Sequence, residues 1–144
     1  MILISHRGNV NGPNPNEENT KDYIKKAVSL GFEVEIDVWF INNEWYLGHN
    51  KPTNKINFSW INNTNLWCHA KNINALYEMI NKNIHCFWHQ KDDFTLTSHR
   101  YIWTYPGKKL TKNSICVLPE IIENIIIPND ISGICSDYIQ NYKT

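Results

Sequence analysis

The chain opens with an apolar stretch that leads directly into three chemically distinctive residues, Ile2-Leu3-Ile4-Ser5-His6-Arg7-Gly8. The apolar residues predict a short buried β-strand that ends at His6. A loop rich in glycine, proline and asparagine follows, up to residue 16. A strand that delivers a histidine and an arginine to a loop places an imidazole and a guanidinium at one edge of a sheet.

The next segments predict a helix and a second strand. The helix has Asn19 or Thr20 as its N-terminal cap and Gly31 as its stop. In residues 32–40, three acids, Glu33, Glu35 and Asp37, alternate with valine and isoleucine. Because side chains at i and i+2 of a strand share one face, these acids are expected to point the same way. Two asparagines at 42–43 predict a hairpin turn into a strand that ends at His49.

The later segments are rich in strands. Residues 66–71 predict a core strand, and the apolar spacing over 72–82 predicts a helix. Further strands are predicted at residues 84–89, 101–105, 114–118 and 133–138, with one short helix near residues 120–125.

Alternating strands and helices predict parallel pairing with right-handed crossovers. A complete (β/α)8 barrel takes roughly 200 residues or more, and this chain has 144. We therefore expect a single α/β domain over residues 1–144, a reduced (β/α) TIM-type barrel with several helices shortened to loops. Catalytic groups of such barrels lie at the C-terminal ends of the strands, and these residues fall there: His6, Asp37, Lys71, His89 and Asp137.

Composition narrows the possible partners and the compartment. Fourteen basic and fourteen acidic residues give a formal charge of zero, which disfavours a nucleic-acid partner. The four cysteines are dispersed without a C-x-x-C pair, so we expect them to be reduced core residues. Neither a signal peptide nor an apolar run of about 20 residues is present. These features predict a cytoplasmic protein without a membrane span.

Residues 4–50 resemble the glycerophosphodiester phosphodiesterase family, a part of the phosphatidylinositol-phospholipase-C-like superfamily. Four spaced motifs carry the resemblance, namely His6-Arg7-Gly8, Glu18-Asn19-Thr20, Glu35-Ile36-Asp37 and His49. Farther along, residues 134–137 look like the family's final strand, and residues 69–71 look like its Glu-x-Lys strand.

The resemblance implies a divalent metal, Mg²⁺ or Ca²⁺, and two histidines that act as general acid and base. Carried over by position, Glu35 and Asp37 are metal ligands, and Glu18 is a further ligand or orients one. His6 and His49 become the proton carriers. Such an assignment suits the chemistry, because imidazole, with a pKa near ~6.5, can take and return a proton at neutral pH.

Phosphate binding is assigned to two cations, Arg7 and Lys71. A metal and an arginine supply positive charge where the phosphodiester transition state develops negative charge.

Three positions depart from the family pattern. His69 stands in the acidic place of the Glu-x-Lys strand, and an imidazole ligand would make the site friendlier to Mn²⁺ or Zn²⁺. Asn50 replaces the aspartate that usually follows the hairpin histidine, and Pro15 is displaced upstream of its usual place.

Several residues have structural interpretations beside the functional ones. His6 could cap or pack at a strand end, and His49 could simply close a hairpin. Pocket positions are also predicted for His89, Trp103 and Asp137. Core packing explains Trp103 equally well, and Asp137 could instead cap the last helical turn.

The sequence therefore predicts metal-dependent hydrolysis of a phosphodiester, a glycerophosphodiester or a related alcohol-phosphate diester of small size. An alternative is a catalytically weak or inactive module that binds phosphate and metal on the same fold. A metal-dependent phosphomonoesterase would need more clustered ligands than the sequence assigns. Neither the alcohol of the substrate nor the oligomeric state is specified.

Overall fold

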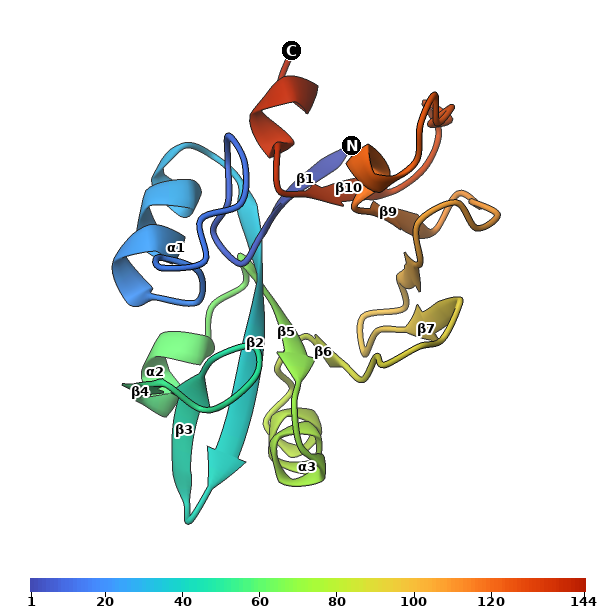
Figure 1. Cartoon of the computed structure of the whole chain (residues 1–144). Helices are drawn as coiled ribbons and strands as arrows, with labels where there is room; N and C mark the ends of the chain where they lie inside the picture. Colours follow the sequence, from blue (N-terminus) through green and yellow to red (C-terminus); the bar gives the residue numbers. More distant parts are fainter.

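A computed structural model describes all residues from 1 to 144, and its core is one ten-stranded sheet that curls round on itself (Figure 1). The strands are β1 Ile2–His6, β2 Glu33–Ile41, β3 Glu44–Leu47, β4 Asn54–Ile56, β5 Leu66–Ala70, β6 Cys86–Phe87, β7 Phe94–Leu96, β8 Ile102–Thr104, β9 Ser114–Val117 and β10 Gly133–Ser136. The helices are α1 Lys21–Ser29, α2 Phe58–Ile61 and α3 Ile73–Asn81, with two 3₁₀ turns, η1 Pro119–Ile121 and η2 Ile139–Tyr142.

The strands of the curl run parallel in the order β8-β9-β10-β1-β2-β5-β6. β2 is long enough to serve three partners: its first part pairs with β1 and β5, and its second part forms the antiparallel hairpin with β3. No ladder joins β6 to β8, although the backbone N–H of Ser98 reaches the carbonyl of Cys86 at 2.9 Å. The fold is therefore mixed α/β with a curled sheet and few helices, and a complete (β/α)8 barrel is not seen.

The two faces of the sheet are buried against different neighbours. Outward-facing residues of β2, such as Val34 and Ile36, pack with Ile24 of α1 and Met79 of α3 in the larger apolar cluster. A second cluster fills the inside of the curl: Ile4, Trp67, Phe87, Trp103, Ile115, Val117 and Cys135. Glu35 and Asp37 of β2 share one face, as the acid pattern predicts, and alternate with the outward residues, so they belong to the inside, which the alternation alone does not decide.

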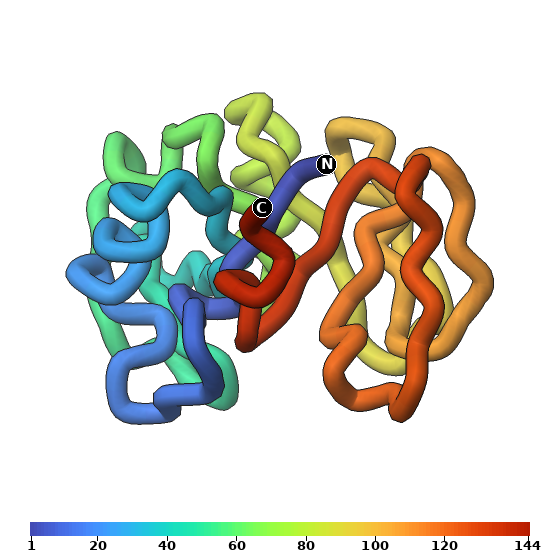
Figure 2. The backbone as a smooth tube through the Cα atoms, turned by 90° about the horizontal axis from the view of Figure 1, so that it is seen from above, coloured from blue at the N-terminus to red at the C-terminus, as the bar shows by residue number.

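Helices gather on one side of the molecule. Figure 2 shows the first half of the chain, blue to green, on that side and the loop-rich second half on the other, with β1 between them. Polar side chains begin both long helices, because the Thr20 hydroxyl accepts from the Tyr23 N–H and the Asn72 carbonyl accepts from the Ala75 N–H. None of the helices has the length and apolar character needed to span a bilayer.

Most predicted elements are present, with corrections in the second half. The helix predicted near 120–125 is only the turn η1, because Ile122 is already extended, with φ of −105° and ψ of 117°, and Asn124 has a left-handed φ of 55°. The strand predicted at 84–89 is only two residues long. The structure also contains β4, β7 and α2, which the sequence patterns do not predict. All four cysteines are buried and free, as expected.

Candidate functional site

Strand register brings the predicted ligands together at one edge of the curled sheet. β1 pairs with β2 so that His6 lies opposite Glu35, and β2 pairs with β5 so that Asp37 lies opposite His69. Because these strands are parallel, their C-terminal ends meet at the same edge. Residues 29 and 32 positions apart in the sequence therefore become neighbours through backbone pairing alone, as the register of these pairs shows.

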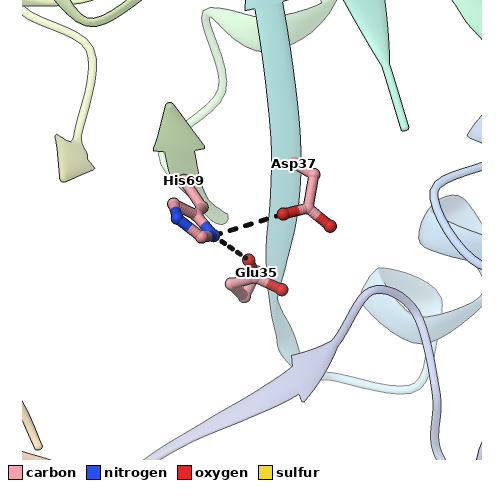
Figure 3. A group of neighbouring side chains, drawn as sticks. All are labelled: Glu35, Asp37 and His69. Atoms are coloured by element: carbon pink, nitrogen blue, oxygen red, sulfur yellow. Dashed lines mark ion pairs between the residues drawn. The ribbon is translucent and has the colours of Figure 1, made fainter. Parts of the chain in front are cut away.

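Glu35, Asp37 and His69 form a cluster in which the possible ligand atoms all lie within 4.8 Å of one another (Figure 3). The His69 Nδ1 is 3.2 Å from Asp37 Oδ1 and 3.7 Å from Glu35 Oε1. Both carboxylates are buried, Glu35 Oε2 accepts no hydrogen bond, and Asp37 Oδ1 has only His69 Nδ1 at 3.2 Å and Lys71 Nζ at 3.6 Å beside it. Two buried acids this close to each other are costly unless positive charge compensates them, so the cluster fits a divalent metal.

The orientation of the His69 ring supports a ligand role. Its Nε2–H donates to the carbonyl of His89 at 2.8 Å, which leaves the Nδ1 lone pair facing the two acids. Burial lowers the pKa of His69, but the bonds to Asp37 and Glu35 and their charges outweigh it and raise the pKa to about 9. A proton on Nδ1 supplies the positive charge that a bound cation would supply there.

Asp37 is the most heavily contacted acid of the site. Its Oδ2 accepts from Asn19 at 2.9 Å and from His49 Nδ1 at 3.2 Å, and it pairs with Arg7 Nε at 3.2 Å. The Asp37 backbone N–H also donates to the Asn19 side chain. Burial raises the pKa of the Asp37 carboxyl, but the bonds from His49 and His69 and the charge of Arg7 hold it well below its usual value. This aspartate is therefore a fixed negative charge.

His6 is held by an acid on its far side. Its Nδ1–H donates to Asp137 Oδ1 at 2.7 Å, and its Nε2 lies 3.9 Å from Glu35 Oε2. Burial lowers the pKa of His6, but the bond to Asp137 and the charge of Glu35 outweigh it, so the pKa is raised. The Nε2 atom of His6 therefore faces the cluster of Glu35, Asp37 and His69. A histidine held by a carboxylate on its other nitrogen is the arrangement of a proton carrier.

Arg7 reaches the cluster because its backbone is left-handed, with φ of 56°. Its Nη1 lies 3.3 Å from Glu18 Oε2, and its Nη2 lies 3.3 Å from His49 Nε2. The second oxygen of Glu18 accepts from Asn9 at 2.9 Å. Glu18 thus lies outside the three-residue cluster and holds Arg7, so of the two roles that the resemblance implies, a metal ligand or a residue that orients one, the first does not agree with its position.

Two adjoining pockets open onto these residues and share His6, Arg7 and His49. One, of about 300 Å³, is lined also by Lys71, His89 and Trp103. The other, of about 460 Å³, is lined also by Glu18 and Asp137. A larger cavity of about 620 Å³ lies between α1 and α2 and is lined by no acid or histidine.

The remaining predicted residues differ in how close they come to the cluster. Lys71 Nζ is 3.6 Å from Asp37 Oδ1, and the exposed His49 reaches Asp37 from the opposite side. His89 lines the pocket and orients His69 through its backbone carbonyl. Trp103 packs in the inner core and still borders the pocket, so it serves both of the roles that its sequence position allowed.

Sequence reasoning missed two positioning residues, Asn9 and Glu120. Asn9 is fully buried and donates both to Glu18 and to Asp137, at 2.9 and 2.8 Å. Glu120 accepts from the backbone N–H of Asp137 at 2.8 Å. Asn9 lies in a loop whose composition predicts only a turn, and Glu120 joins the site from a distant part of the chain, so no local signal marks either residue.

Neither models of known protein families nor curated proteins nor solved structures match this chain.

Proposed function

We propose that the protein is a divalent-metal-dependent phosphodiesterase. The observation that carries the proposal is the convergence of two buried acids and His69, with Glu35 Oε2 accepting no hydrogen bond, beside two histidines and two cations. A metal held there supplies Lewis-acid and charge stabilisation of a phosphate. The imidazole of His69 favours Mn²⁺ or Zn²⁺ more than a set of oxygen ligands alone would. The experiment below therefore compares these two ions with Mg²⁺ and Ca²⁺.

The roles of the other residues follow from their placement. His6 and His49 reach the shared pockets from β1 and from the end of the β2–β3 hairpin. In the proposed reaction one of them takes the proton of the attacking oxygen, and the other protonates the leaving oxygen. Arg7 and Lys71 bind the phosphate oxygens, and Asp137 keeps the His6 ring in the tautomer that offers Nε2.

One observation favours a second candidate, a module that binds phosphate and metal without turnover. Both ring nitrogens of His49 lie against other side chains, Nδ1 at 3.2 Å from Asp37 Oδ2 and Nε2 at 3.3 Å from Arg7 Nη2. His49 has to leave one of these partners before it can carry a proton. Binding of phosphate with no hydrolysis of any diester would support this candidate.

The test is hydrolysis of bis(p-nitrophenyl) phosphate and of glycerophosphodiesters with Mg²⁺, Ca²⁺, Mn²⁺ or Zn²⁺, with and without EDTA. Glu35→Gln should lower the metal-dependent rate at least about 100-fold, since it removes a ligand charge. Glu33→Gln is the matched control, because Glu33 lies on the same face of β2 and bonds Trp67 instead of the cluster. Activity that survives EDTA and Glu35→Gln would contradict the metal assignment.

A further inference from the structure

The smaller pocket has two chemically different walls. Strands β1, β2 and β5 contribute the charged wall described above. The other wall comes from β8, β9 and the turns that follow them, and consists of Trp103, Tyr105, Pro106, Val117, Leu118 and Ile121. In Figure 1 these two groups of strands lie on opposite sides of the curl. A phosphate bound at the charged wall therefore has one of its ester groups directed at an apolar surface.

Two residues of this wall are unusually exposed for their type. Tyr105 is 46 % exposed and Ile121 is 63 % exposed, and both border the pocket. Tyr105 also lies near the His89 ring, with ring centroids 5.8 Å apart. Apolar side chains that remain exposed beside a polar cluster form the surface on which an apolar ligand group gains most from burial.

Ile121 is held in this position by the rest of the site. Leu118 adopts a left-handed backbone with φ of 44°, which turns the chain after β9 into η1. Glu120, next to Ile121, accepts from Ser136 Oγ at 3.0 Å and from the Asp137 N–H at 2.8 Å. A leucine in this conformation costs free energy. The strained turn at Leu118 and the two hydrogen bonds of Glu120 fix Ile121 relative to Asp137, the partner of His6.

The wall disfavours a polyol. Glycerol hydroxyls placed against it would lose water and find few partners, and a buried hydroxyl without a partner costs free energy. A hydrocarbon group gains free energy from the same burial. The pocket of about 300 Å³ holds a phosphate and a short apolar group, and Tyr105 and Ile121 extend the apolar surface outward from it.

We propose that the substrate is an amphiphilic phosphodiester whose ester group on the β8–β9 side is an alkyl or aryl group instead of glycerol. The proposal rests on the proposed function for the site's turnover, but the preference for apolar phosphate esters is a binding property. It can therefore be tested whether or not the protein hydrolyses anything.

The test compares the binding of hexyl phosphate and glycerol 3-phosphate by calorimetry, both in the presence of Mn²⁺. Both esters carry the same phosphate group, so the difference between their affinities measures the contribution of the apolar wall. Hexyl phosphate should bind at least about tenfold more tightly. Ile121→Asn and Tyr105→Ala should each remove most of this preference while leaving the affinity for glycerol 3-phosphate within about twofold.

Ile80→Asn on α3 is the matched control, because Ile80 is 53 % exposed and does not line the pocket. It should keep the preference unchanged. Equal binding of the two esters, tighter binding of glycerol 3-phosphate, or no binding of hexyl phosphate would overturn the proposal. A hexyl phosphate preference in a protein that hydrolyses no diester would uphold this inference and refute only the phosphodiesterase activity.

Discussion

At the residue scale, the His6–Asp137 pair is the feature that most directly links geometry to proton transfer. The two side chains come from strands at neighbouring positions of the curl, β1 and β10, although 131 positions separate them in the sequence. His6 is prominent in the sequence because it ends a strand and precedes Arg7-Gly8. Its partner Asp137 is less prominent in the sequence, because an aspartate at the end of a strand can equally cap the helical turn that follows.

Asp137→Asn should lower the pKa of His6. Burial lowers this pKa, and the bond and charge of Asp137 are among the causes that raise it, so their loss shifts it downward. An NMR titration of the His6 ring protons measures the shift directly. The same variant should reduce diester hydrolysis at least about tenfold, since the ring loses its orienting carboxylate.

Asp93→Asn is the control for this variant, because Asp93 is exposed and pairs only with Lys108. It should leave the pKa of His6 and the rate unchanged. An Asp137→Asn protein with an unaltered His6 pKa would contradict the assigned role of the pair.

A different histidine predicts the acid sensitivity of the fold. His85 is buried, forms a hydrogen bond with Thr97 Oγ1 at 2.9 Å and stacks on the ring of His99. Burial and the neighbouring His99 lower its pKa to about 4. The unfolded chain binds a proton on this residue below about pH 6.5, whereas the folded protein does not until about pH 4. Stability should therefore fall as the pH falls through this window.

Urea unfolding at pH 7 and pH 4.5 tests this prediction. The wild type should lose about 2 kcal/mol more stability over this range than His85→Gln, which cannot be protonated. His99→Gln should keep most of the wild-type loss, because burial is the larger cause of the shift. Parallel stability curves for wild type and His85→Gln would refute the prediction.

At the scale of elements, the turn between β1 and the following loop depends on Gly8. Its φ is +96°, and a Cβ at this position would lie 2.5 Å from Tyr23 Cδ1 of α1. The glycine therefore allows the chain to reverse closely over α1, and Arg7 before it to point into the site. The sequence predicts a turn here, but the close approach of α1 requires the tertiary structure.

Gly8→Ala should destabilise the protein more than Gly31→Ala does. Both glycines have left-handed φ values, but the nearest atom to a Cβ on Gly31 is Lys143 Nζ at 3.7 Å. Gly31→Ala should cost about 1–2 kcal/mol from the backbone alone. Gly8→Ala should cost at least about 1 kcal/mol more, because of the overlap with Tyr23. Urea unfolding of both variants measures the difference, and equal costs would show that Tyr23 yields freely.

Elements with a regular pattern could be predicted, and those defined by distant contacts could not. The alternating acids of residues 33–37 predict strand β2 and the acids' common face, because the period of a strand is independent of its partners, but that this face turns inward depends on the fold. The apolar spacing of α3 predicts the helix, yet Ile73, Tyr77 and Ile80 are exposed and Ala75 and Met79 are buried. Periodicity thus identifies a helix, while its neighbours decide which face is covered.

At the scale of the whole molecule, parallel pairing brings together the cluster of Glu35, Asp37 and His69 from β2 and β5. His6 joins it from the neighbouring strand β1, and His49 joins it from the end of the β2–β3 hairpin. Chain length and strand content correctly predicted an α/β fold with a curled parallel sheet and few helices, with long helices only after β1 and β5, whereas a closed barrel is not seen. The shape of the second half could not be predicted. Its strands are two to four residues long, so their places depend on pairing rather than on local propensity.

Divalent metal should stabilise the whole fold, because the ligands of the cluster join β2 to β5 and the unfolded chain has no such site. At a metal concentration of 100 times Kd the gain is about 2.7 kcal/mol. This corresponds to a rise in Tm of roughly 9 °C for a domain of this size. Thermal unfolding followed by circular dichroism should show the rise with Mn²⁺ and its reversal with EDTA. A Tm independent of Mn²⁺ would argue against a built metal site.

The central claim is that Glu35, Asp37 and His69 together bind a divalent cation, and calorimetric titration with Mn²⁺ tests it most directly. The wild type and Glu33→Gln should each bind one ion per chain with the same affinity. Glu35→Gln should bind at least about tenfold more weakly. No saturable binding to the wild type, or equal binding by Glu35→Gln, would contradict the claim.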